Sequence, residues 1–139
     1  MSSRLVDIIT AQDPTVRDMP LEYACQGLTP SQLLAECAAL DAFRRQTANL
    51  YERVRACFFL YALHRFQLQG TLGQAATHIP FESYAYLLER RFEESIDTLL
   101  AVQAAQGPSD ALSSALAEAY HALGFQHLAN QVKKSVRSV

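Results

Sequence analysis

The residues best suited to chemistry in this chain are its histidines, which are spread along the sequence. No H-E-x-x-H motif occurs, and no two histidines are four residues apart, the spacing by which one helix holds zinc. His121 and His127 are expected on the two helices of one hairpin, where a shared ligand is the minor alternative to ordinary surface histidines. His64 follows a long apolar run, so we expect it at the edge of the core, and His78 carries no motif.

Carboxylates and thiols also lack a catalytic arrangement. Glu93, Glu94 and Asp97 lie within one expected helix, where such a cluster is typical of a solvated face and paired acid–base work needs differing environments. The three cysteines are odd in number and form no C-x-x-C, which argues against a disulfide framework and favours a reducing compartment. Cys57 lies in an apolar stretch, so its thiol is expected to be inert. We predict no enzymatic activity, no catalytic or metal-binding residue and no cofactor.

Composition bounds the class of protein. The chain has 139 residues, of which 50% are hydrophobic and 19% charged, and a formal net charge of -2. These values indicate one folded domain and exclude disorder. Two basic groups, at residues 44–55 and 133–137, leave a phosphate or nucleic-acid surface as a weaker alternative, and we predict no nucleic-acid partner. The longest apolar run, 56–63, is far shorter than the roughly 20 residues that span a bilayer, so we expect a cytoplasmic protein without a membrane partner.

Apolar residues recur with the period of a helix almost throughout, which predicts an all-α fold. Thr29-Pro30-Ser31-Gln32 is a capping-box start, and Asn49 can cap the next helix. Breaks are expected at Arg90-Arg91, at Gly107-Pro108 and at Gly124. The expected helices cover residues 3–11, 20–26, 30–46, 50–69, 80–89, 91–105, 109–123 and 125–137. Within 50–69, the run 56–63 is apolar all round and is expected at the centre of the fold.

The second half contains an internal repeat. Tyr86 and Tyr120 are 34 residues apart, as are the alanines that precede them. Residues 85–99 and 116–129, with an Ala-Tyr pair ending one helix and small residues after the turn, resemble the tetratricopeptide repeat, a helix-turn-helix unit of this length. Arg90, Gln126 and Lys133 depart from the pattern of that family.

The resemblance implies antiparallel helical hairpins stacked into a tetratricopeptide-like α-α superhelix. We expect one all-α domain over 1–139, with a non-repeating helical half at 1–70 and two degenerate repeats at 79–139. Gly124 is expected to form the turn of the second repeat, and Ala117 and Ala129 to let its helices approach closely. Tyr86 and Tyr120 are expected to be mostly buried.

The family holds peptides and partner helices on its concave surface, so the resemblance implies a protein-interaction or scaffolding module. The positions expected to line that surface are Glu82, Arg90, Ser114, Glu118 and His121. One alternative is an N-terminal regulatory or dimerising domain of a larger enzyme whose active site lies beyond residue 139. A third is a small-ligand binder that uses the loop 70–79 as a lid.

The C-terminal residues carry an apolar stripe, Val132, Val136 and Val139, at spacings of four and three. A helical stripe with nothing to cover it should meet another surface. We expect either downstream segments of a longer polypeptide, which is the favoured interpretation, or the same surface on a second copy in a homodimer.

Overall fold

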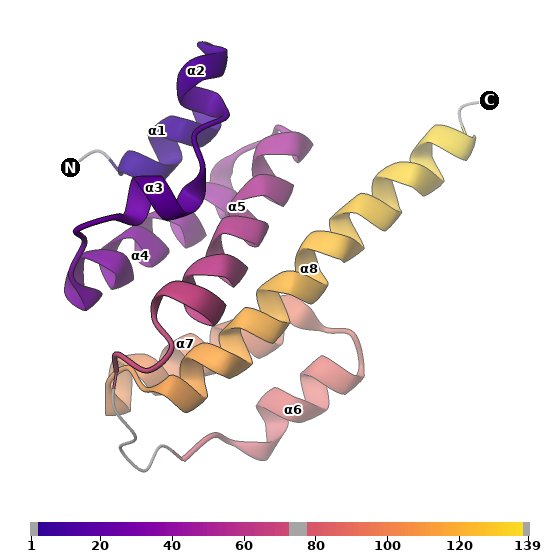
Figure 1. The fold of residues 1–139 in the computed structure, drawn as a ribbon. Coiled ribbons are helices and arrows are strands. Elements are labelled where there is room, and N and C mark those ends of the chain that lie inside the picture. Colours follow the sequence, from indigo (N-terminus) through magenta and orange to yellow (C-terminus); the bar gives the residue numbers. More distant parts are fainter. Residues whose placement is uncertain (1–2, 73–77, 138–139) are drawn as a thin grey trace.

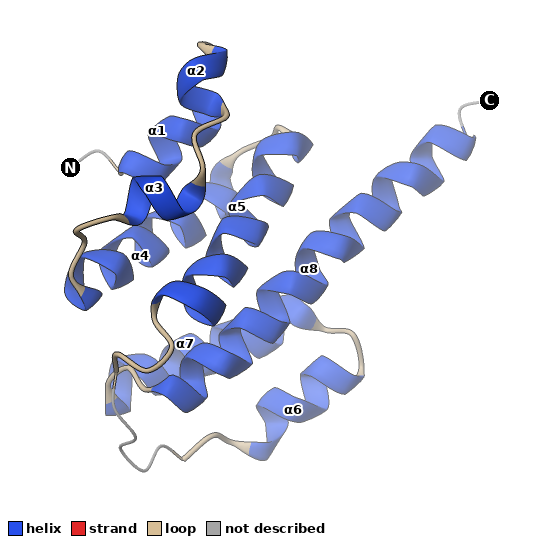
Figure 2. Ribbon diagram, in the orientation of Figure 1, coloured by secondary structure: helices blue, strands red, loops and turns tan. Residues whose placement is uncertain are grey.

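The computed structural model describes residues 3–72 and 78–137, and Figure 2 shows helices and loops only in these ranges. The helices are α1 (Arg4–Thr10), α2 (Pro14–Arg17), α3 (Leu21–Cys25), α4 (Pro30–Gln46), α5 (Leu50–Ala62), α6 (Phe81–Leu88), α7 (Phe92–Gln106) and α8 (Asp110–Arg137). A π-helical turn, η1 (Leu63–Gln67), directly follows α5. The predicted all-α class is confirmed.

Side-chain caps fix where several helices begin. The predicted capping box is present, because Thr29 Oγ1 accepts a hydrogen bond from the Gln32 amide at 3.2 Å and Gln32 Oε1 accepts one from the Thr29 amide at 2.8 Å. Asn49 Oδ1 likewise accepts from the amide of Glu52 at 3.1 Å. Asp13 caps the short α2, which lies between the expected helices 3–11 and 20–26 and was not predicted.

The helix predicted over 50–69 changes its hydrogen bonding at Leu63. The Leu68 amide donates to the Leu63 carbonyl at 2.9 Å, a bond across five residues that marks a π turn. The wider turn carries His64, whose side chain is buried. His64 was expected at the edge of the core, but its side chain lies in the interior of the fold.

The helices do not pack in the order of the chain. α8 lies between α5 and α7, so that the packing order is α4, α5, α8, α7, α6, with α1 against α4 and α5 (Figure 1). The apolar run 56–63 supplies much of the core, as predicted, although only half of its residues are fully buried. The largest buried apolar side chains come from α1, α4, α5, η1, α7 and α8: Leu5, Leu40, Leu60, Leu63, Ile96, Leu99, Leu112, Leu116 and Leu123.

The predicted break at Gly124 is wrong, because α8 continues through this residue to Arg137. A Cβ atom at Gly124 would lie 3.1 Å from Phe58 Cζ and 3.4 Å from Cys57 Cβ, both on α5. The absent side chain therefore permits close approach of α8 to α5, and no turn is formed. Sequence alone does not distinguish these two uses of glycine.

The continuous α8 also changes the interpretation of the repeat. Residues 109–123 and 125–137 are one helix, so the helix-turn-helix predicted for the second repeat is not formed, and Ala129 is exposed rather than packed between helices. The first predicted unit does have this form, since α6 and α7 make a hairpin. Arg90, which stands where the family has glycine, adopts a positive φ of 62° in its turn.

The two repeat tyrosines differ in burial. Tyr120 is 1% exposed, which confirms the prediction for this residue. Tyr86 is only half-buried and lies beneath the Arg91 guanidinium, 4.8 Å from its ring centroid, so the prediction of a mostly buried Tyr86 is wrong. The reason is that α6 packs against α7 at the outer end of the fold, and no helix of the described residues covers its other side.

Candidate functional site

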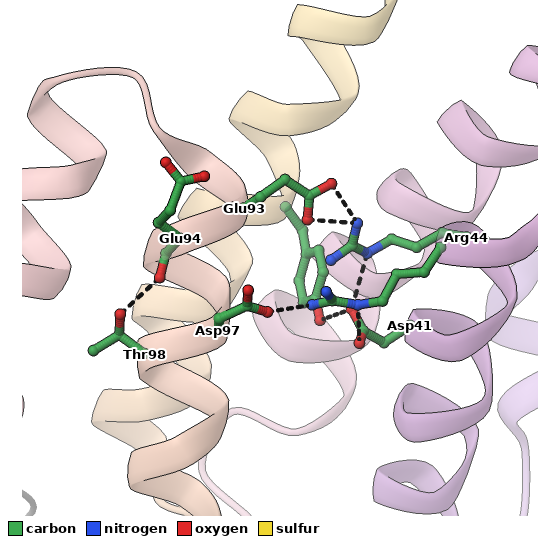
Figure 3. A network of polar contacts seen from close by, with 8 residues as sticks. Asp41, Arg44, Glu93, Glu94, Asp97 and Thr98 are labelled. Carbon is green, nitrogen blue, oxygen red and sulfur yellow. Dashed lines mark hydrogen bonds and ion pairs between the residues drawn. The ribbon is translucent and has the colours of Figure 1, made fainter.

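A buried polar network joins α4, α7 and α8 (Figure 3). Arg44 is 1% exposed, and its Nε donates to Asp41 Oδ1 at 2.8 Å while its Nη1 donates to both carboxylate oxygens of Glu93 at 2.9 and 3.0 Å. The Tyr120 hydroxyl donates to Asp41 Oδ1 at 2.7 Å. Nη2 of Arg44 is buried without a protein partner. One cation thus holds two carboxylates from different helices.

Arg45 extends this network toward the surface. It donates to Asp41 Oδ2 at 2.9 Å and to Asp97 Oδ1 at 2.7 Å, so that two arginines of α4 pair with two carboxylates of α7. Burial alone raises the pKa of Asp41, but the charge of Arg44 and the hydrogen bonds from Tyr120 and Arg45 outweigh it and hold the pKa below its ordinary value. The cluster of Glu93, Glu94 and Asp97, predicted as a solvated face, is half-exposed. Two of its members, Glu93 and Asp97, form ion pairs with the arginines of α4.

A cleft of about 410 Å³ opens beside this network, between α4, α7, α8 and η1. Its walls are mainly apolar, and its polar groups are Asp41, His64, Gln103 and Tyr120. His64 Nδ1 lies 3.1 Å from Ser113 Oγ, and its ring is stacked on Tyr120 with centroids 6.0 Å apart. Burial lowers the pKa of His64 to about 4, so its imidazole is neutral at pH 7.

The groups around this cleft are engaged in the fold. Both oxygens of Asp41 accept hydrogen bonds from side chains, and burial raises the pKa of the Cys37 thiol to about 12. A general base or nucleophile needs a pKa near the working pH and a free atom directed at substrate. The geometry therefore favours a structural role for the network, with the cleft suited at most to an uncharged apolar molecule.

The burial of His64 predicts a pH dependence of stability. Between about pH 6.5 and the folded pKa of about 4, the unfolded chain binds a proton that the folded chain excludes. Stability therefore falls as the pH is lowered through this window, by on the order of 3 kcal/mol from this group. In urea unfolding, His64→Gln should lose this part of the slope, whereas the exposed control His78→Gln should keep it. Equal slopes in wild type and His64→Gln would contradict the assignment.

Three of the five predicted partner-binding residues lie together. Ser114, Glu118 and His121 follow one another along α8 and, with Tyr61 and Arg65, line a hollow of about 420 Å³ between α8 and the end of α5 with η1. Glu118 also borders a second, smaller hollow toward α6. These three residues thus occupy a strip of α8 that has α5 and η1 on one side and α6 on the other (Figure 1).

The other two predicted residues lie apart from that strip. Glu82 is exposed in the first turn of α6, and Arg90 is exposed in the turn between α6 and α7. Only the Arg90 carbonyl reaches α8, where it accepts from Gln126 Nε2 at 3.4 Å. The structure therefore does not join Glu82 and Arg90 to the other three residues.

An aromatic cluster next to the strip was missed by the sequence analysis. The His121 ring lies 4.5 Å from Tyr61 and 4.9 Å from Phe125 between centroids, and Phe58 and Phe66 contact the same group edge-on. Phe66 and Phe125 are 64% and 54% exposed. The signal for this cluster was present in the apolar run of α5, but it was attributed entirely to the core. Aromatic residues that stay exposed beside arginine are enriched in protein interfaces.

The apolar stripe continues along α8 past Gly124. We call the outer face of α8 the line formed at spacings of four and three by Ser114, Glu118, His121, Phe125, Leu128 and Val132. Helical periodicity places this line opposite the core-facing positions Leu116, Tyr120 and Leu123. Beyond Gly124 the core-facing line becomes polar, with His127, Gln131 and Lys134. The exposed apolar residues are thus not a continuation of the chain's own core.

Other predicted features are placed as follows. Val132 is 62% exposed, as expected of an uncovered stripe, whereas the side chains of Val136 and Val139 lie outside the described part of the chain, as do residues 73–77 of the predicted lid. The hairpin expected to carry His121 and His127 is not formed, and the two histidines lie on different faces of one helix, which contradicts the minor alternative of a shared ligand. Among the described residues, no group of three or more histidine, cysteine or acidic side chains is arranged to hold a metal ion.

Within the described ranges, no helix has the combination of length and hydropathy needed to cross a membrane. Comparison of this chain with protein-family models, with curated proteins and with solved structures finds no match in any of the three.

Proposed function

We propose that this chain is a helical protein-interaction module without catalytic activity, and that its partner lies along the outer face of α8. One observation carries the proposal: Phe125, Leu128 and Val132 are exposed on the side of α8 that faces away from the core. Contiguous exposed apolar residues rimmed by polar ones mark binding surfaces in soluble proteins. Here the rim is Ser114 and Glu118 at one end and Lys133 and Lys134 beside the other.

The spacing of the outer face indicates the shape of the partner. Steps of four and three residues form the seam along which two helices interlock side chains. The half-buried aromatic residues Tyr61 and His121 supply the rigid, amphipathic contacts that carry most binding energy in interfaces. A helical segment with its own apolar seam therefore fits this face better than a peptide that binds by adding a strand to a sheet edge, because the described residues form no sheet.

The repeat resemblance supports the same function in a narrower form. We propose that the α6–α7 hairpin is a single tetratricopeptide-like unit, and that the α8 surface beside it takes the role of the concave face in that family. A regulatory or dimerising domain of a larger enzyme would use the same face toward another part of its own polypeptide. The predicted cytoplasmic location stays a proposal as well.

A photo-activated crosslinking residue tests the proposal in cells that express the protein. Placed at Leu128, on the outer face, it should give a discrete crosslink to a polypeptide. The matched control is Asn130, which is also exposed but lies on the other side of the same helix. Equal, diffuse crosslinking from both positions would overturn the proposed face.

A further inference from the structure

The last turns of α8 lack a neighbour among the described residues of the chain. Residues 128–134 are all exposed, and Figure 1 shows this end of the helix extending past α5 and α7. An isolated helical segment of this length is marginal in water, because most helix stability in proteins comes from packing an apolar face. The apolar residues Leu128 and Val132 have no face to pack against in the described part of the chain.

We infer that the occupant of the outer face is a second copy of this chain, with the two α8 helices antiparallel across a two-fold axis. The inference rests on the proposed function and names its partner. In such a dimer each copy uses the same surface, so one stripe supplies both sides of the interface. The extending end of each α8 then lies along the strip of the other copy that is flanked by α5, η1 and α6.

Sterics select the antiparallel direction. Residues 110–127 form the flanked part of α8, which other helices contact, whereas the exposed residues 128–134 form its free part (Figure 1). In a parallel pair, the flanked parts of the two helices would meet each other, and so would the two free parts. In an antiparallel pair, the free part of each helix lies against the flanked part of the other. Opposed helix dipoles are also favourable in this arrangement.

The seam spacing fixes the register. When Phe125 lies opposite Leu128 of the second copy, His121 lies opposite Val132 of the second copy, and the same contacts repeat across the axis. Val132 then enters the aromatic surroundings of His121, beside Tyr61 and Phe66. The small side chain of Ala129 next to the seam allows the helices to approach closely.

The area available is sufficient for a specific contact. An aromatic side chain has about 150–250 Å² of surface, so Phe66 and Phe125, each more than half exposed, offer on the order of 100 Å² apiece. With Leu128, Val132 and their polar rim, covering the patch on both copies buries on the order of 1,000 Å², the lower limit for a biological interface. Interfaces of this size are typical of weak, transient complexes, so we expect a dimer that forms reversibly.

Sedimentation equilibrium of the 139-residue chain, up to about 100 µM, tests the association. Wild type should dimerise, and Phe125→Ser should weaken the dimer by at least about tenfold. The control Leu88→Ser removes an apolar side chain of α6 that is even more exposed than Phe125, and this variant should dimerise as wild type does. A monomeric wild type throughout, or equal weakening by both substitutions, overturns the inference.

Disulfide trapping tests the direction and register. A mixture of His121→Cys and Val132→Cys chains should form a mixed disulfide dimer, because these positions face each other across the antiparallel pair. Val132→Cys alone should not, and rapid trapping of that variant with itself would overturn the antiparallel arrangement. A monomeric chain that still crosslinks at Leu128 to a different polypeptide overturns the second copy as occupant and leaves the proposed function standing.

Discussion

Arg44→Ala is expected to lower the free energy of unfolding by about 3–5 kcal/mol, because removing one member of a buried ion-pair network leaves its partners uncompensated. Arg44 is fully buried and bonds Asp41 and Glu93, so its loss separates α4 from α7 at their main polar contact. Urea unfolding at pH 7, followed by circular dichroism, measures the change.

The neighbouring arginine is the matched control. Arg45 also bridges α4 and α7, through Asp41 and Asp97, but its side chain is 36% exposed and the Asp97 side chain is 59% exposed. Exposed ion pairs contribute about 0–1 kcal/mol, so Arg45→Ala should cost far less than Arg44→Ala. Equal losses from the two variants would show that burial of Arg44 does not set the strength of the network.

Tyr120→Ala should lower the free energy of unfolding by about 3–5 kcal/mol, as other large buried aromatic truncations do. The ring of Tyr120 packs on His64 and lies 5.4 Å below the Arg44 guanidinium, and its hydroxyl bonds Asp41. The substitution therefore removes a core side chain and one partner of the network together. Equilibrium unfolding in urea gives the value.

Two further variants separate these contributions. Tyr120→Phe keeps the ring and should cost about 1–3 kcal/mol, because Asp41 loses one hydrogen-bond donor while buried. Tyr86→Ala removes the other repeat tyrosine, which is half-buried, and should cost clearly less than Tyr120→Ala. A loss below about 0.5 kcal/mol for Tyr120→Ala would contradict the packing described for α8.

Local chemistry made most of the helices predictable. Helix caps act through hydrogen bonds within three residues, as Thr29 and Asn49 do, and Pro30 follows the first of these caps. Such features can be identified from the sequence without knowing the fold. The all-α class follows from helical periodicity in the same way. The π turn at His64 has no comparable local signal, whereas the start of α2 does have one, in the Asp13 cap followed by Pro14.

Features that depend on which helices meet were not predictable. Gly124 has the residue type of a turn, but its role depends on the position of Phe58 on α5. Arg44 has the residue type of a surface position, but it is buried where Glu93 of α7 meets it. The residues next to Gly124 and Arg44 in the sequence include neither Phe58 nor Glu93. Neither role can therefore be predicted from the local sequence.

The candidate site shows the same division. Ser114, Glu118 and His121 were predicted because they are spaced along one helix face, which is local information. They lie beside Tyr61 and Phe66 because α8 packs on α5 and η1. The order of the helices along the chain does not predict this packing. The other two predicted partner-binding residues, Glu82 and Arg90, lie apart from these three because α6 packs at the edge of the fold.

The central claim is that Leu128 and Val132, at the exposed end of the outer face of α8, serve association and contribute nothing to the chain's own core. The most direct measurement is urea unfolding of the double variant Leu128→Ser and Val132→Ser at a concentration low enough to keep the chain monomeric. Both side chains are exposed, so we expect the free energy of unfolding to change by less than about 0.5 kcal/mol while association is lost. A loss above about 2 kcal/mol at that concentration would show that these residues pack within their own chain, and would contradict the account.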